Sequence, residues 1–142
     1  MYLDPGDENL RLLIERAPAG TLVMLNLLRF RDVADYSNHP DLDPGRPISG
    51  REAYERYTAH TMPFLVESGG SVEFVGDGGH YFIGPTDERW DQVLLVRQAG
   101  IAEFFAFAEN QDYLAGLGHR EAALEDSRLL PLVPLDTATG ER

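Results

Sequence analysis

One stretch of the sequence, residues 21–30, constrains the fold more than any other part of the chain. It reads Thr-Leu-Val-Met-Leu-Asn-Leu-Leu-Arg-Phe and is almost continuously apolar. Such a run is typical of a strand that is covered on both faces of its sheet. Alternation assigns the side chains to two faces: Leu22, Met24, Asn26, Leu28 and Phe30 to one, and Val23, Leu25, Leu27 and Arg29 to the other. Both faces therefore need a cover, and the two polar side chains need partners.

Two helix signals stand on either side of this strand. Asp4-Pro5 predicts the N-cap and first turn of a short N-terminal helix. Ser49 and Glu52 have the spacing of a capping box, which predicts the start of a longer helix. Pro63 should bend that helix or locally break its hydrogen bonds, and Gly69-Gly70 should end it. Residues 32–48, between the strand and this helix, are predicted to form a long loop, functional or mobile.

The second half of the chain predicts further strands and helices. Residues 71–75 and 80–83 read as two short strands, and the glycine-rich sequence between them, Gly76-Asp77-Gly78-Gly79, is a hairpin signal. The remaining expected elements are a strand over 92–97, helices over 101–110 and 118–125, and a strand over 128–133. Pro131 cannot donate a ladder hydrogen bond, so the last strand should lie at a sheet edge.

The order of these elements predicts an α+β fold, a ferredoxin-like β-α-β-β-α-β sandwich with an extra β-hairpin and an N-terminal helix. The length of 142 residues suits a single domain. We divide it into a helical extension over 1–20, a ferredoxin-like core over 21–134 and a tail over 135–142, disordered from Asp136 on. Helices on one face leave the other face bare, and a second copy of the same sheet would cover it. The sequence therefore predicts a homodimer.

Composition excludes several classes of function. Acidic residues outnumber basic ones 24 to 12, and the resulting net charge of −12 argues against nucleic-acid and membrane partners. The chain has no cysteine, and all 12 basic residues are arginine. Thiolate nucleophiles, Schiff-base chemistry and a P-loop lysine therefore have no residue to carry them. We see neither a signal-peptide pattern nor an apolar run of about 20 residues, and we expect a cytoplasmic protein.

Several segments together resemble the DUF1330 family, over about residues 21–134. They are Val23–Phe30, Ser49–Tyr54, Ser68–Gly70 and Trp90–Val96, followed by Asp112-Tyr113, Arg120 and Asp126–Leu129. The resemblance implies membership of the dimeric α/β-barrel superfamily, in which two ferredoxin-like sheets close into a barrel. It also implies a homodimer with a pocket between sheet and helices in each subunit. It implies no particular reaction, because superfamily members include cofactor-independent monooxygenases, muconolactone isomerases, haem-degrading enzymes and chlorite dismutases.

Two residues are candidates for catalysis if the protein is an enzyme. The chemistry that its residues still allow is proton transfer, or cofactor-independent oxidation, on a small and partly apolar organic acid. Arg29 offers a planar donor fork that could hold a carboxylate or enolate. Histidine is the side chain best suited to carry a proton near neutral pH, so His60 could do so, with Tyr57 adjacent to it on the predicted helix. Neither a cofactor nor a metal is expected, and haem is a weaker third option.

Five residues are candidates for substrate binding. Asn26 could orient a carbonyl, and Tyr57 could donate a hydrogen bond from its hydroxyl. Tyr81 and Trp90 could form the wall of an apolar pocket. Arg120, at the start of a predicted short helix, could help to hold an anion. The same side chains also have a structural explanation, in which they pair with carboxylates, bond to the backbone or pack in the core. The alternative function is therefore a non-catalytic dimeric module that binds a ligand or acts as an accessory protein.

Overall fold

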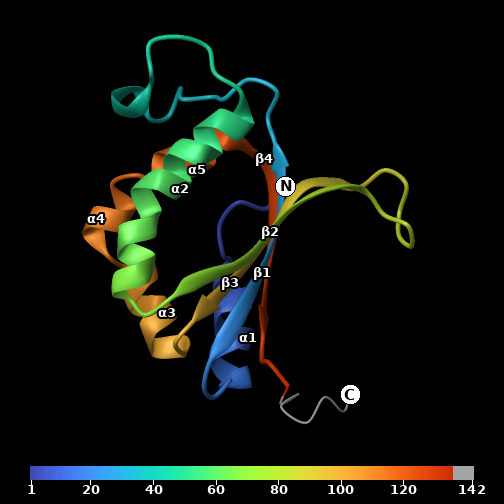
Figure 1. Ribbon diagram of the computed structural model, residues 1–142, viewed down its shortest axis with the longest axis vertical. Helices are drawn as coiled ribbons and strands as arrows, with labels where there is room; N and C mark the ends of the chain where they lie inside the picture. Colours follow the sequence, from blue (N-terminus) through green and yellow to red (C-terminus); the bar gives the residue numbers. More distant parts are fainter. Residues whose placement is uncertain (136–142) are drawn as a thin grey trace.

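The computed structural model describes residues 1–135, which form an antiparallel sheet with helices on one of its faces (Figure 1). From Asp136 on, the predicted tail lies outside the described residues. The helices are α1 (Asp7–Arg16), α2 (Gly50–Glu67), α3 (Ile101–Ala108), α4 (Gln111–Leu114) and α5 (Leu117–Ala123), with a short 3-10 helix, η1 (Pro40–Leu42). The strands are β1 (Leu22–Phe30), β2 (Ser71–His80), β3 (Arg89–Gln98) and β4 (Leu124–Leu132).

The strands lie in the order β2-β3-β1-β4, and each neighbouring pair is antiparallel. Together with the β-α-β-β-α-β order of the core, this arrangement confirms the predicted α+β, ferredoxin-like class. β1 is an interior strand, where Leu25 lies opposite Leu95 of β3 and Leu130 of β4. β4 is at the edge of the sheet, as Pro131 predicted. The sheet is open and does not close into a barrel within one chain.

The two faces of the sheet differ in how well they are covered. On the helix face, Leu22, Met24 and Leu28 of β1 are almost completely buried. The opposite face, which we call the open face, carries no helix among residues 1–135 (Figure 1). Phe74 of β2 and Leu130 of β4 lie on it and are 54% and 52% exposed. The apolar side chains that β1 directs to its two faces are thus covered on only one of them.

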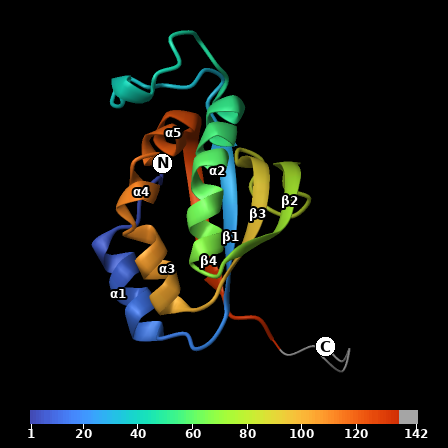
Figure 2. The ribbon, with the colours of Figure 1, turned by 60° about the vertical axis from the view of Figure 1, so that its left-hand side comes forward.

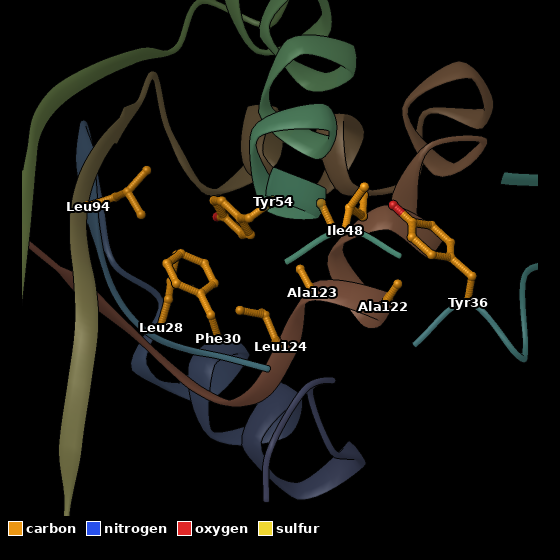
Figure 3. Close-up of a cluster of buried hydrophobic side chains, with 10 residues drawn as sticks. Leu28, Phe30, Tyr36, Ile48, Tyr54, Leu94, Ala122, Ala123 and Leu124 are labelled. Carbon is orange, nitrogen blue, oxygen red and sulfur yellow. The ribbon is translucent and has the colours of Figure 1, made fainter. Parts of the chain in front are cut away.

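The core fills the space between β1, β3 and the helices (Figure 3). Phe30 of β1 packs against Tyr54 of α2, with 5.6 Å between ring centroids. The segment between β1 and α2, residues 32–48, contributes two buried side chains, Tyr36 and Ile48. Burial of these side chains holds the long loop to the core near both of its ends.

α2 begins and ends where the sequence predicts. The Ser49 hydroxyl accepts a hydrogen bond from the Glu52 backbone N–H at 3.0 Å, which confirms the N-cap. Pro63 removes one hydrogen-bond donor, yet the helix continues past it to Glu67. Gly69 has a φ of +89°, a conformation that glycine adopts readily, and it lies directly after the C-cap.

Two predictions about local structure are wrong. Gly76–Gly79 forms no turn, because β2 runs unbroken from Ser71 to His80 and pairs along its length with β3. The extra hairpin is therefore an extension of the β2–β3 hairpin, whose connection is residues 81–88. A Cβ on Gly78 would lie 2.5 Å from the Trp90 carbonyl oxygen, so this glycine permits close strand approach. The N-terminal helix also starts later than predicted, with Gly6 and not Asp4 as its N-cap.

Gly50 lies where three backbone segments meet. Its N–H donates to the Arg31 carbonyl at 3.0 Å, and the Arg31 N–H donates to the Ala123 carbonyl at 2.8 Å. A Cβ on Gly50 would lie 2.3 Å from the Arg31 oxygen and 2.6 Å from the Ala123 oxygen. Only glycine therefore allows the start of α2 to lie against the end of β1 and the start of β4.

We expect Gly50→Ala to lower the free energy of unfolding by about 1–3 kcal/mol, because the added methyl forces the backbone segments apart. Gly79→Ala is the matched control, since nothing lies within 4 Å of the Cβ that it adds. Its effect should stay within about 0.5 kcal/mol. Urea unfolding of the two variants measures the difference, and equal losses would contradict the steric explanation.

Asp126 of β4 fastens the N-terminal residues to the sheet. Its carboxylate accepts hydrogen bonds from the backbone N–H of Tyr2 at 2.7 Å and of Ser127 at 2.9 Å, and from the Arg128 guanidinium at 2.8 Å. Burial opposes ionisation of this carboxyl, but the three donors outweigh it and lower the pKa of Asp126. The ionised carboxylate therefore stabilises the folded chain.

Asp126→Asn should lower the free energy of unfolding at pH 7 by about 1.5–3 kcal/mol, the usual effect of hydrogen bonds to a charged group. Because the pKa of Asp126 is lowered on folding, its stabilisation is present above the ordinary carboxyl range and is lost as the pH falls through the lowered value. Urea unfolding of the two proteins should therefore converge at acidic pH. Asp4→Asn, at an exposed position, should change little at any pH. A pH-independent difference for Asp126→Asn would contradict this assignment.

Candidate functional site

Three of the predicted site residues lie together on the open face. The Trp90 indole N–H donates to the Tyr81 hydroxyl oxygen at 2.6 Å. The Arg29 guanidinium carbon lies 5.9 Å from the centroid of the Trp90 ring, and that of Arg128 lies 5.0 Å from it. Arg29 also lies 3.7 Å from Asp126. The structure thus brings Arg29, Tyr81 and Trp90 into one cluster, with Arg29 beside carboxylates.

The hydrogen bonds of this cluster fix the protonation of Tyr81. Its hydroxyl donates to the Glu88 carboxylate, which raises the pKa of Tyr81 and lowers the pKa of Glu88. Tyr81 therefore stays protonated at neutral pH and is a donor and acceptor, not a base. Trp90 is only 2% exposed. The cluster holds the base of the β2–β3 hairpin, where Tyr81 is 38% exposed but Trp90 presents almost no surface to a ligand.

The predicted pair on α2 lies on the other side of the sheet. The hydroxyls of Tyr57 and Tyr113 are hydrogen bonded at 2.7 Å. The His60 ring lies 2.7 Å from the Asp112 carbonyl oxygen. That oxygen can only accept, so His60 Nε2 carries the proton. Tyr57 and His60 thus fasten α2 to neighbouring residues of α4, and each bonds to a different partner. Burial raises the pKa of Tyr113, so its hydroxyl stays neutral.

The last two predicted residues bond to the chain itself. The Arg120 guanidinium donates to the Leu3 carbonyl at 2.7 Å and to the Ser127 hydroxyl at 3.2 Å. The Asn26 amide donates to the Met24 carbonyl at 3.2 Å. Asn26 thus bonds to nearby backbone, as its structural explanation has it, whereas Arg120 bonds to a carbonyl and a hydroxyl in place of the expected carboxylate. The seven predicted residues therefore occupy several places and do not converge on one cavity.

A groove of about 360 Å³ lies on the helix face, between α2 and strands β2 and β3. Apolar, aromatic and a few polar side chains line it: Phe30, Arg51, Tyr54, Glu55, Thr58, Ala59, Val75, Gln92 and Leu94. None of the seven predicted site residues is among them. Its volume falls within the range of small-molecule sites, which are mostly apolar with a few polar groups.

Arg51 supplies the positive charge of this groove. Its guanidinium carbon lies 4.9 Å from the centroid of the Phe30 ring, and one of its nitrogens lies 3.2 Å from the Asp77 carboxylate. Both members of that ion pair are exposed, so the pair is weak and leaves guanidinium donors for another anion. Deeper in the groove, burial raises the pKa of Tyr54, so its hydroxyl is neutral. The groove therefore combines a cation, an apolar wall and neutral polar groups.

These groove residues are not among the predicted site residues, although the sequence carries a signal for them. Arg51 and Tyr54 belong to the Ser49–Tyr54 segment, and Gln92 belongs to the Trp90–Val96 segment, both of which carry the DUF1330 resemblance. We explained the first segment by its capping box and the second by its strand pattern. Only the fold shows that side chains so far apart in sequence line the same groove.

Residues 1–135 contain no group of three or more His, Asp or Glu side chains placed to hold a metal ion. In the same part of the chain, no helix is both long enough and apolar enough to cross a membrane.

Comparison with known proteins gives a family but no activity. No protein-family model and no curated protein matches the sequence. The RPA0582 protein of Rhodopseudomonas palustris, described as a protein of unknown function, is 35% identical, with a TM-score of 0.82 over 95% of this chain and 98% of that one. Its methylated form is 36% identical, with the same TM-score over 95% and 96% of the two chains.

A further similar structure is more distant. It is a dimeric ferredoxin-like protein of unknown function from Thermobifida fusca, with 15% identity and a TM-score of 0.49 over 82% of this chain and 92% of that one. The likeness to the Rhodopseudomonas palustris protein is much stronger and spans nearly the whole of both chains. The chain therefore belongs to the family of the RPA0582 protein.

Proposed function

We propose that this protein is a homodimer that binds a small, partly apolar organic acid in the groove between α2 and strands β2 and β3. The observation that carries the proposal is the lining of the groove, where Arg51 stands over an apolar and aromatic wall formed by residues such as Phe30 and Leu94. A carboxylate would bind the guanidinium, and the rest of the ligand would lie against the wall.

The polar groups of the groove suit one carboxylate and one further polar group. Arg51 offers a planar donor fork, which fits a carboxylate better than a point charge does. The Gln92 amide can both donate and accept, so it suits a carbonyl or hydroxyl elsewhere on the ligand. A volume of about 360 Å³ is near the lower end of ligand sites, which favours an acid with a short chain or a single ring.

Binding has more support than catalysis. Proton transfer or cofactor-independent oxidation by His60 and Arg29 would require both side chains to reach one ligand. His60 bonds to the Asp112 carbonyl on the helix side, whereas Arg29 lies beside Trp90 on the open face. Their catalytic roles stay predictions, and the groove supports the non-catalytic alternative, a dimeric ligand-binding module.

The homodimer is supported by the open face. Its apolar side chains, Phe74 and Leu130 among them, would be costly to leave in water. The charge of the chain, −12, opposes contact between most of its surfaces. On the open face, however, Arg97 pairs with Glu73 and Arg128 pairs with Asp126, so two copies can approach there without strong repulsion.

Two finer assignments belong to the same proposal. The segments that resemble DUF1330 lie in the core of the fold, and we assign the chain to that family on this resemblance. Pairing of two open faces would give the dimeric α/β barrel that the resemblance implies. A cytoplasmic location remains the expectation from the sequence.

The ligand proposal predicts that isothermal titration with benzoate, phenylacetate and hexanoate will detect binding of at least one acid. The corresponding amides should bind at least tenfold more weakly, because they lack the charge that pairs with Arg51. Arg51→Gln should weaken the binding of the acid by the same factor. Arg11→Gln is the control, since Arg11 is exposed on α1 and pairs only with neighbouring glutamates. Equal affinity of acid and amide, or of Arg51→Gln and wild type, would contradict the proposal.

The dimer proposal predicts that sedimentation equilibrium will find two copies, and that Leu130→Asp will raise the dissociation constant at least a hundredfold by placing a charge on the open face. Val66→Asp is the matched control, because Val66 is an exposed apolar residue of α2, away from that face. It should leave the association unchanged. Trp90, the single tryptophan, lies beside the open face and gives a fluorescence signal for dissociation. A wild-type protein that stays a single copy would overturn the proposal.

A further inference from the structure

We propose that the tip of the β2–β3 hairpin, residues 81–88, packs against the second copy of the chain, so that each subunit holds its partner with an arm. The proposal rests on the homodimer proposed above and adds a contact outside the paired sheets. Residues 81–88 connect β2 to β3 beyond their last pair, His80 and Arg89.

The arm points to the side of the sheet that lacks a cover. In Figure 1 the end of the hairpin leaves the plane of the sheet and projects away from α2, α4 and α5, past the open face. Figure 2 shows α2 in front of β1, with the end of the hairpin at the opposite edge of the view from α4 and α5, beside β2 and β3. A second copy placed on the open face would therefore lie within the reach of the arm.

The tip carries apolar side chains that their own subunit leaves exposed. Phe82 is fully exposed and Ile83 is 88% exposed. Adjacent exposed apolar side chains of this size are typical of a contact surface. The open face of a partner would offer them apolar neighbours of the kind seen at Phe74 and Leu130.

The arm is held in position before any partner binds. The Tyr81 hydroxyl accepts a hydrogen bond from the Trp90 indole and donates one to Glu88, which ties the first residue of the connection to the last. Gly84 has a φ of +158°, and a Cβ there would lie 2.4 Å from the Tyr81 ring. An ordered arm loses little conformational freedom when it docks, which favours a specific contact.

A second copy fits this arm better than an unrelated protein does. A two-fold dimer through the open face would use each arm once, in two equivalent contacts. The base of the arm is continuous with that face, because Trp90 lies against Arg29 and Arg128 there. The arm and the open face would therefore form a single interface.

The first test is the combined substitution Phe82→Ser and Ile83→Ser, measured by sedimentation equilibrium. Both side chains are exposed in one copy, so urea unfolding of the single copy should be unchanged, whereas the dimer dissociation constant should rise at least tenfold. Val66→Ser, at another exposed apolar position, should leave the constant unchanged. If Leu130→Asp disrupts the dimer but the combined Phe82 and Ile83 substitution does not, the arm contact alone is overturned. A wild-type single copy would overturn the homodimer as well.

The second test uses the absence of cysteine from the chain. Phe82→Cys carries the only thiol, which can be labelled with a benzophenone maleimide and crosslinked by light. In a mixture of ¹⁴N and ¹⁵N subunits, we expect crosslinks of mixed isotope composition from position 82 to β1, β3 or β4 of the other copy. Val66→Cys with the same label should give none. Crosslinks confined to one isotope would show that the arm folds back on its own subunit, and would overturn the proposal.

Discussion

The central strand β1 directs apolar side chains to both faces of the sheet, and this constraint organises the rest of the molecule. On one face, Leu28 packs in a core cluster with residues of α2 and α5, and the start of α2 can approach β1 only because Gly50 has no side chain. On the other face, Leu25 lies in line with Leu95 and Leu130, and no helix follows to cover them in the described part of the chain. The hydrophobic effect thus explains the buried core and supports the partner proposed for the open face.

The two faces of the sheet also separate the proposed ligand site from the proposed dimer interface. The groove belongs to the helix face, where Arg51 and Tyr54 come from α2 and Gln92 comes from β3. Arg29, Trp90 and Tyr81 belong to the open face, where they hold the base of the arm. A ligand in the groove would therefore not meet the open face, the surface proposed to pair two copies. The strand β3 belongs to both regions and links them through a rigid ladder of hydrogen bonds.

Local patterns predicted the elements well, but they could not predict what distant segments build together. The Ser49 cap and the edge position implied by Pro131 depend on a few neighbouring residues, and both are confirmed. Gly76–Gly79 has the local preference of a turn, yet pairing with β3 keeps it in a strand. The groove was missed because Arg51 and Gln92, which lie far apart in sequence, meet only in the folded chain.

The hydrogen bond from the Tyr2 N–H to Asp126 joins positions 124 residues apart. Among the described residues, α1 lies between them in sequence and has no buried side chain. The first residues are thus held more firmly than the helix that follows them, which reverses the usual loosening of a chain toward its end. Amide hydrogen exchange should therefore be slower at Tyr2 than in the middle of α1, whose last residue, Arg16, is in turn bonded to the Pro131 carbonyl of β4.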